Sequence, residues 1–168
     1  MKTGDTAPMD HSATPALQIP DEAVDRLDSR DDAAADVVAR LRRAGLRPTR
    51  QRTALAGLLF SRGDRHVSAE TVYEEAIAAR VSVSLATVYN TLNQFTAAGL
   101  LRELAVSGAK SFFDTRTSPH HHFWSESDGE MIDVAAEEVA VARLPEPPPG
   151  MEIAGVEVMI RLRPRTTA

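Results

Sequence analysis

Residues 84–95 are the segment that most constrains the fold of this chain. Apolar side chains recur there at intervals of three and four residues, so a helix gathers them into one stripe for packing against a core. These side chains are Leu85, Val88, Leu92 and Phe95. The other side of the helix carries short, uncharged hydrogen-bonding groups where a merely solvated helix would carry Glu and Lys. They are Ser84, Thr87, Asn90, Thr91 and Gln94, with Tyr89 at the margin. Such a face suits contacts with base edges and phosphates in a DNA groove.

Two consecutive helices are predicted to begin in the same way. Ser68 and Ser84 are N-cap residues, and each follows a valine that can pack on a second valine in the first turns of the helix. The short connection at residues 80–83 joins the two helices as a helix-turn-helix. Gly99 ends the second helix, and residues 100–106 and 110–114 then read as the two strands of a hairpin. Together these elements predict a winged helix-turn-helix, with Lys110 placed to meet a phosphate.

Two further helices are predicted to precede this pair. The first begins near Asp31 or Asp32 and ends at Gly45, a residue that readily adopts the left-handed conformation. The second begins at Pro48-Thr49 and continues to Phe60. Residues 1–30 are acidic and rich in proline and small residues, so we expect a mostly disordered arm with local helix near residues 21–27.

The net charge of −5 hides a concentrated basic block. Residues 37–65 hold eight arginines against one acidic residue, Asp64. Local charge matters more than the total for attracting phosphates. Arg50 falls in the first turn of a predicted helix, where a cation opposes the helix dipole and where a phosphate contact would explain its presence.

Other function classes are excluded by composition. The absence of cysteine excludes disulfides, thiolate metal sites and thiol redox chemistry. No apolar run approaches the length that crosses a bilayer, and the acidic N-terminus lacks the pattern of a secretory signal. We therefore expect a cytoplasmic protein that does not associate with membranes.

The character of the chain changes after Asp114. Pro119 leads into three histidines, an acidic loop follows, and residues 131–134 read as a strand. We expect a helix over residues 135–144, a proline-rich break, and a half-buried strand in which Val156, Val158, Ile160 and Leu162 alternate with polar residues. This unit of residues 116–168 is small for an independent core, so pairing with a second copy is expected. The predicted fold is therefore α+β, with a winged-helix domain at residues 31–115 and a small α/β dimerisation domain after it.

The histidine run predicts half of a metal site. In an extended segment alternate side chains point the same way, so His120 and His122 share one side and His121 faces the other. Two imidazoles on one side are suitable ligands for a first-row metal. The alternative is a solvated loop with no ligand.

Several segments resemble the Fur family of metal-responsive repressors, in the order and at the spacing of that family. They are residues 45–52 (Gly-Leu-Arg-Pro-Thr-Arg-Gln-Arg), 66–70 (His-Val-Ser-Ala-Glu), 86–90 (Ala-Thr-Val-Tyr-Asn), 92–95 (Leu-Asn-Gln-Phe) and the histidine run. The resemblance spans roughly residues 35–163. Without cysteine and with three histidines, the chain is most similar to the iron response regulator branch (Irr), which senses iron or haem status. The resemblance implies a homodimer whose winged-helix domain binds AT-rich operator DNA.

The resemblance also assigns DNA contacts. Tyr89 would contact bases or thymine methyl groups, and Arg47 stands where family members carry a basic residue that enters the minor groove. Asn90 replaces an arginine common in the iron-sensing branch, so operator preference need not match that branch. The complete set of expected DNA contacts is Arg47, Arg50, Ser84, Thr87, Tyr89, Asn90 and Lys110.

The implied regulatory metal site lies between the two domains. Its expected ligands are His66, Asp114, His120, His122 and Asp133. Imidazoles with carboxylates suit iron, manganese or, in vitro, zinc, and ligand type alone does not choose among them. Haem held by His120, His121 or His122 is a second candidate. Residues 125–128, Ser-Glu-Ser-Asp, stand where many family members have a Cys-x-x-Cys pair, so no structural zinc held by four cysteines is expected.

The leading hypothesis is a DNA-binding transcriptional regulator, not an enzyme, that responds to iron or haem. A regulator that senses manganese or peroxide is an alternative within the same class. A metallohydrolase is disfavoured because no nucleophile elbow, phosphate loop or His-Glu-x-x-His helix is present. A protein-binding adaptor is disfavoured because it has no need of eight arginines within residues 37–65.

Overall fold

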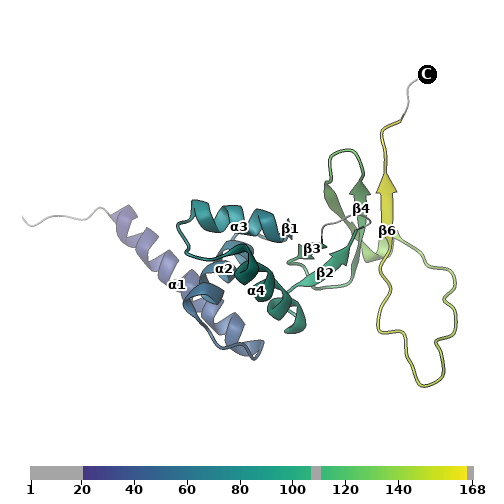
Figure 1. The fold of residues 1–168 in the computed structure, drawn as a ribbon, viewed down its shortest axis with the longest axis horizontal. Coiled ribbons are helices and arrows are strands. Elements are labelled where there is room, and N and C mark those ends of the chain that lie inside the picture. The colour runs from purple at the N-terminus through teal and green to yellow at the C-terminus, as the bar shows by residue number, and fades with distance from the viewer. Residues whose placement is uncertain (1–20, 107–110, 166–168) are drawn as a thin grey trace, which may run out of the picture.

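The computed structural model describes residues 21–106 and 111–165, with side chains described from residue 32 onward. A helical unit with a small sheet stands beside a second, all-strand unit (Figure 1). The first unit comprises α1 (Asp21–Arg43), α2 (Arg50–Phe60), β1 (His66–Ser68), α3 (Ala69–Ala78), α4 (Leu85–Ala97), β2 (Arg102–Ala105) and β3 (Ser111–Asp114). The second comprises β4 (His120–Ser125), β5 (Met131–Ala135), the 3-10 turn η1 (Ala136–Glu138) and β6 (Met159–Leu162). The predicted α+β class is confirmed. Among the described helices, none combines the length and apolar character needed to span a bilayer.

The N-caps predicted from sequence form as expected. The side-chain oxygens of Thr49, Ser68 and Ser84 each accept a hydrogen bond from a backbone N–H three residues on. These bonds satisfy donors that a helix start otherwise leaves unpaired. The helices then close on a single apolar core. Its fully buried side chains include Leu41, Leu55, Leu59, Val72, Val88, Leu92 and Phe95.

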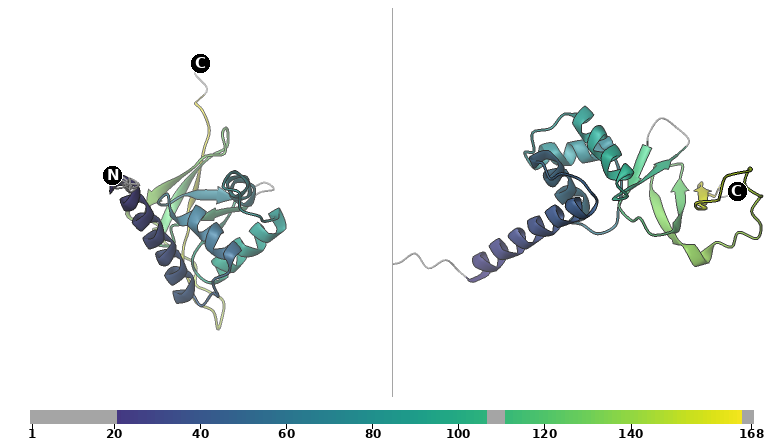
Figure 2. Two further views of the ribbon diagram at one scale, coloured as in Figure 1. Left: turned by 90° about the vertical axis from the view of Figure 1, so that its left-hand side faces the viewer. Right: turned by 90° about the horizontal axis from the view of Figure 1, so that it is seen from below.

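The first helix is longer than predicted. It begins at Asp21, ten residues before the expected start at Asp31, and its first turns extend beyond the other helices (Figure 2). Asp21 and Glu22 follow a proline, and acidic residues favour a helix N-terminus. Residues 21–30 of the expected disordered arm are therefore helical, and residues 1–20 lie outside the described part of the chain.

The buried stripe of α4 differs from the predicted one by two residues. Leu85 is 36% exposed, whereas Thr91 is 5% exposed and its hydroxyl donates to the Thr87 carbonyl at 2.8 Å. Leu85 is the first helical residue and projects past the edge of the core. Thr91 lies on the core side because positions 88, 91, 92 and 95 share one helical face.

A third strand in the wing sheet was not predicted. β1 pairs with β3, which also pairs with β2, so the order is β1-β3-β2. The register places His66 opposite Asp114 and Asp114 opposite Arg102. β1 has only three residues, too few to show the alternation from which a strand is predicted, so the sequence did not indicate it. Lys110, expected at the wing, lies outside the described residues.

The second sheet has β4 at its centre. β5 pairs with β4 antiparallel, β6 pairs with it parallel, and the order is β5-β4-β6. His122 lies opposite Asp133 on one side and Met159 on the other. β4 therefore presents the histidine run between two neighbouring strands.

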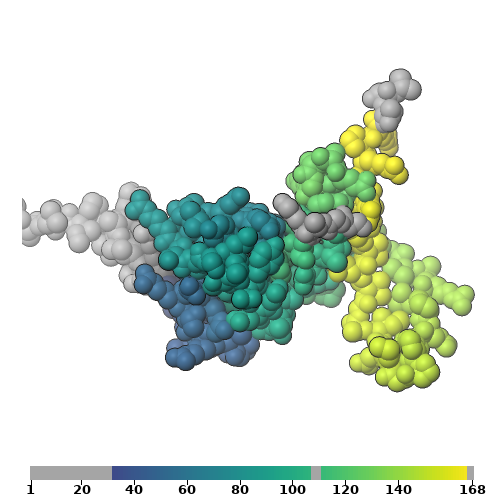
Figure 3. Space-filling model, in the orientation of Figure 1, coloured from purple at the N-terminus to yellow at the C-terminus, as the bar shows by residue number. Residues whose placement is uncertain are grey.

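The predicted helix over residues 135–144 is wrong. Only η1 forms there, and the exposed residues 140–156 lie in a long loop that extends away from the sheets (Figures 1 and 3). The prolines at 145 and 147–149 limit any helix to about two turns, and a helix that short needs packing contacts to be stable. The expected alternation of the last strand is also not observed, because Val156 and Leu162 are both exposed. β6 lies at the edge of its sheet.

Arg80 adopts a left-handed conformation, with φ of 57°, in the turn between α3 and α4. A side chain with Cβ is disfavoured there by about 1 kcal/mol relative to glycine. We predict that Arg80→Gly raises the free energy of unfolding by about 0.5–1 kcal/mol, measured by urea denaturation. Gly99→Ala is the matched control, because Gly99 holds φ of 70° after α4 with open space around it, and this change should lower stability by a similar amount. Destabilisation by Arg80→Gly would show that contacts of the arginine side chain stabilise the fold by more than the left-handed backbone conformation destabilises it.

Candidate metal centre

The two sheets lie next to each other (Figure 2, right), and contacts of His66 with Asp133 and of Asp114 with His120 join them. In the wing sheet one row runs His66, Asp114, Arg102 across β1, β3 and β2. In the second sheet Asp133 and His122 lie opposite each other on β5 and β4. Because the strands are ordered in this way, side chains distant in sequence face one another across the junction.

The alternation of β4 directs its histidines to opposite sides, as predicted. His120 and His122 are almost completely buried and point to the junction. His121 is turned away, and its Nδ1 accepts a hydrogen bond from the Val158 backbone N–H at 3.3 Å. Two of the three imidazoles are therefore available to one site.

All five ligands expected from the sequence come together. His66 Nε2 lies 3.0 Å from Asp133 Oδ1, and His120 Nε2 lies 3.0 Å from Asp114 Oδ2. His122 Nε2 lies 3.7 Å from Asp114 Oδ2 and 3.9 Å from Asp133 Oδ1. Ligand atoms at right angles around a metal with bonds of about 2.1 Å are about 3.0 Å apart. The cluster is thus close to the size that one ion requires.

These five donor atoms are buried and have no hydrogen-bond partner. They are His66 Nε2, Asp114 Oδ2, His120 Nε2, His122 Nε2 and Asp133 Oδ1. Leaving one buried polar atom unsatisfied costs about 1–3 kcal/mol, so five converging at one point require a common partner. A divalent cation supplies that partner, and the residues present fit it.

The protonation states also suit a metal. Burial lowers the pKa of His66 despite the nearby carboxylates of Asp114 and Asp133, which favours the neutral imidazole. Burial raises the pKa of Asp114, but the His122 imidazole and the Arg116 backbone N–H outweigh it and leave the pKa below its usual value. Neutral imidazole and ionised carboxylate are the metal-binding forms.

Each aspartate is held by a second contact that leaves one oxygen for the cluster. The Arg116 backbone N–H donates to Asp114 Oδ1 at 2.7 Å, and the Arg116 guanidinium donates to Asp133 Oδ2 at 3.1 Å. Outer contacts of this kind orient ligands. Arg116 therefore directs both free oxygens toward the imidazoles.

The donor set is three nitrogens and two oxygens without sulfur. Imidazole and carboxylate together suit Fe(II), Mn(II), Co(II) or Zn(II), and a set larger than four exceeds the usual structural zinc. The haem alternative is not supported. His120 and His122 are buried within the cluster, and His121 on the other side of β4 is only 7% exposed.

The N-terminus of α2 packs beside the polar face of α4. The Arg52 guanidinium donates to Gln94 Oε1 at 2.7 and 3.0 Å and to the Arg47 carbonyl at 2.9 Å. Arg47 and Arg50 are exposed, as are Ser84, Tyr89 and Asn90, whereas Thr87 is half-buried. The structure thus joins the basic segment before α2 to the exposed face of α4.

Tyr89 is restrained before any DNA is bound. Its hydroxyl donates to Glu70 Oε1 at 2.6 Å, and this hydrogen bond raises the pKa of Tyr89. The contact joins the first turn of α3 to α4. Sequence reasoning did not single out Glu70 in this role, although it lies within one of the segments that resemble the family.

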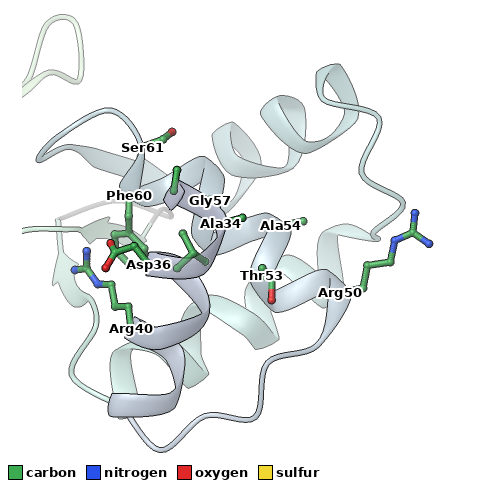
Figure 4. Close-up of a pocket in the computed structure, with 11 residues that line it drawn as sticks. Ala34, Asp36, Arg40, Arg50, Thr53, Ala54, Gly57, Phe60 and Ser61 are labelled. Atoms are coloured by element: carbon green, nitrogen blue, oxygen red, sulfur yellow. The ribbon is translucent and has the colours of Figure 1, made fainter. Parts of the chain in front are cut away.

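A groove with a volume of about 650 Å³ lies elsewhere, between α1 and α2 (Figure 4). Small side chains such as Ala34, Ala54 and Gly57 line it, and the Arg40 guanidinium covers the Phe60 ring at 3.7 Å. Its lining contains no grouping of histidines or nucleophiles. The groove therefore offers no chemistry comparable to the junction between the sheets.

Comparison with known proteins identifies the family of this chain. The family model described as the ferric uptake regulator family, FUR, matches residues 43–158. The chain belongs to the Fur family. The ferric uptake regulation protein of Pseudomonas aeruginosa is 40% identical over 100 residues, 59% of this chain and 75% of that protein. The peroxide-responsive repressor PerR of Staphylococcus epidermidis is 35% identical over 107 residues, 64% and 71% of the two chains.

Solved Fur structures have the same fold. The ferric uptake regulator of P. aeruginosa with manganese aligns with a TM-score of 0.61 and 31% identity, covering 76% of this chain and 97% of that one. The Vibrio cholerae regulator aligns with a TM-score of 0.60 and 25% identity, covering 75% and 98%. These relatives are regulators, which agrees with the expectation that the chain is not an enzyme.

This Fur-family chain has no cysteine with which to hold a thiolate zinc. Residues 125–128 form a turn instead: the Ser125 and Ser127 hydroxyls are 3.1 Å apart and Asp128 accepts from the Glu130 N–H. Hydrogen bonds therefore close the turn between β4 and β5.

The sequence predicted five candidate ligands but not the side chains that contact them. Arg116 stands two residues after Asp114, a spacing that allows its backbone N–H to reach the carboxylate. Glu157 lies 3.1 Å from His122 Nδ1 and 3.2 Å from Arg102 Nη2, although it is far from both in sequence. Only the pairing of the strands brings Glu157 to the site.

We predict that His120→Ala with His122→Ala weakens Mn(II) binding by at least about 100-fold, because two of five donors are removed. The signal is the fluorescence of Trp124, the one tryptophan, whose ring packs 5.3 Å from Phe112 across the sheet junction. His121→Ala is the matched control and should bind Mn(II) as the wild type does. Equal affinity in wild type and the double variant would place the metal elsewhere.

Proposed function

We propose that this chain is a dimeric, DNA-binding transcriptional regulator whose operator affinity responds to a divalent metal held by His66, Asp114, His120, His122 and Asp133. One observation carries the proposal: buried donor atoms of His66, His120, His122 and Asp133 lie within 4.8 Å of one another, and Asp114 Oδ2 lies 3.0 Å from His120, all without another hydrogen-bond partner. A cation bound there would tie the DNA-binding unit to the second unit.

The division of ligands between the sheets supports a regulatory role. His66 and Asp114 belong to the wing sheet, while His120, His122 and Asp133 belong to the other. Metal binding would fix the angle between the two units. In a dimer that angle sets the separation of the two α4 helices, which must match the spacing of operator half-sites.

The second unit supports the proposed dimer. Several of its apolar side chains are exposed, and the segment at residues 140–156, exposed throughout, is long for a connection without helix or strand. The exposed residues are Ile132, Val141, Leu144, Met151, Ile153, Val156 and Leu162. A second copy of the chain is the natural partner for such a surface.

DNA recognition is proposed for the N-terminus of α4 and the segment before α2. Arg47, Arg50, Ser84, Thr87, Tyr89 and Asn90 are the proposed contacts, together with Lys110 outside the described residues. The support is that Thr87 and Asn90 line one hollow with Arg52 and Gln94, and that the Arg52 guanidinium also donates to the Arg47 carbonyl. Preference for AT-rich operators and membership of the iron response regulator branch both remain predictions from the resemblance.

Iron and manganese are the proposed signals, since the donor set suits both. The P. aeruginosa regulator was solved with manganese, and the S. epidermidis relative is a peroxide-responsive repressor. Peroxide sensing is therefore the second candidate. Loss of metal-dependent DNA binding after peroxide treatment of the Fe(II) protein, but not of the Mn(II) protein, would identify it.

We predict that the protein selects a defined sequence from a random duplex library and that Mn(II) changes its affinity for that sequence about 10-fold or more. The physical reason is that a cation shared by both units selects one angle between them. Fluorescence anisotropy with Mn(II) and with excess chelator measures the change. His121→Ala should respond like the wild type, whereas equal affinities with and without every candidate metal would contradict the proposal.

We predict that Tyr89→Ala weakens binding to the selected operator by about 1–3 kcal/mol while binding to scrambled DNA changes little. Tyr89 is exposed on the helix proposed to enter the groove. Tyr89→Phe is the matched control, because it keeps the ring and removes only the hydroxyl that contacts Glu70. Equal losses on operator and scrambled DNA would argue against base recognition by this side chain.

A further inference from the structure

Glu157 lies just before β6 and divides its two carboxylate oxygens between the two units. Oε1 lies 3.1 Å from Nδ1 of His122, on the ring side opposite the metal-facing nitrogen. Oε2 lies 3.2 Å from Nη2 of Arg102, on β2 of the wing sheet. One side chain therefore touches both a metal ligand and the DNA-binding unit.

The contact between Arg102 and Glu157 is the third that joins the two sheets. His66 on β1 meets Asp133 on β5, and Asp114 on β3 meets the histidines on β4. Arg102 on β2 then meets Glu157 at the start of the segment that pairs with β4 as β6. The first two contacts are made by metal ligands, while this third one needs no metal.

His122 depends on Glu157 for its orientation. Its imidazole is fully buried, its Nδ1 has no other hydrogen-bond partner among the described residues, and the Glu157 carboxylate lies 3.1 Å from it. A carboxylate that accepts a hydrogen bond from Nδ1–H leaves the Nε2 lone pair directed at the cluster and makes Nε2 a better metal ligand. Arg102 holds that carboxylate in place, and both side chains are about one-third exposed or less.

We propose that Glu157 is a positioning residue of the metal centre, held by Arg102, and that this pair couples the wing sheet to His122. The inference rests on the proposed metal-binding function. It assigns a role to two residues that are not ligands. Through them, a displacement of β2 would change the orientation of His122 at the metal, and loss of the metal would change the position of β2.

The test uses the full-length protein stripped of metal and titrated with Mn(II) and with Co(II). Glu157→Ala should weaken Mn(II) binding about 10- to 100-fold, the usual effect of removing a contact that orients a ligand. Arg102→Gln should weaken it in the same direction by less. The double variant Arg102→Gln with Glu157→Ala should bind no more weakly than Glu157→Ala alone, because the arginine acts through the glutamate.

Glu126→Gln is the matched control. Glu126 pairs with Arg161 at 3.4 Å in the same sheet, away from the cluster, so its loss should leave Mn(II) affinity unchanged. The Co(II) absorption bands should shift in Glu157→Ala and stay unchanged in Glu126→Gln. Circular dichroism checks the fold, and if Glu157→Ala fails to fold, Arg102→Gln decides the outcome.

A lower melting temperature with wild-type Mn(II) affinity and an unchanged Co(II) spectrum would overturn the inference, since that is the result for a merely structural ion pair. Independent, multiplicative losses from the two variants would also overturn it. If the wild type binds neither metal, the proposed function itself fails. If the wild type binds and the variants bind equally well, only the role of Glu157 fails.

Discussion

Two carboxylates and three imidazoles share one buried space where two small sheets meet. The position of one sheet relative to the other depends on this cluster. Asp114 is fully buried, and an ionised carboxylate in such a place is costly unless a compensating charge lies beside it. A divalent cation would balance both aspartates and at the same time give a partner to each imidazole nitrogen that lacks a hydrogen bond.

The same cluster explains why the two units are built as they are. β1 pairs with β3 just before the chain enters α3, and this pairing brings His66 beside Asp114. A central β4 is needed so that His120 and His122 face the wing while the neighbouring chain segments supply Asp133 and Glu157. The sheets contribute little core of their own, so their junction gains strength from polar contacts and from the Phe112–Trp124 pair.

DNA recognition and sensing are separated in space but mechanically connected. The capped α4 helix is anchored by its apolar stripe, and Arg52 ties it to the segment that carries Arg47. β2 follows α4 directly in the chain, and the wing sheet to which β2 belongs contains two of the proposed ligands. A rearrangement at the metal centre therefore needs to pass only through β1, β2 and β3 to reach the proposed DNA-binding surface.

Local signals in the sequence were enough to predict the caps, the helix-turn-helix and the pairing of His120 with His122 on one side of a strand, because each depends on residues a few positions apart. The full ligand set came from the resemblance to the Fur family, and geometry then supported it. Local reasoning was wrong where packing decides. Leu85 was predicted to be buried but is exposed, and Thr91 was predicted to be exposed but is buried. Residues 139–144 did not form a helix because nothing packs on them. The sequence by itself determined which side chains could bind a metal and which helix could read DNA. Only the tertiary structure decided that Arg102, Arg116 and Glu157 serve the metal centre, because their contacts arise from the register of strands that lie far apart in the chain.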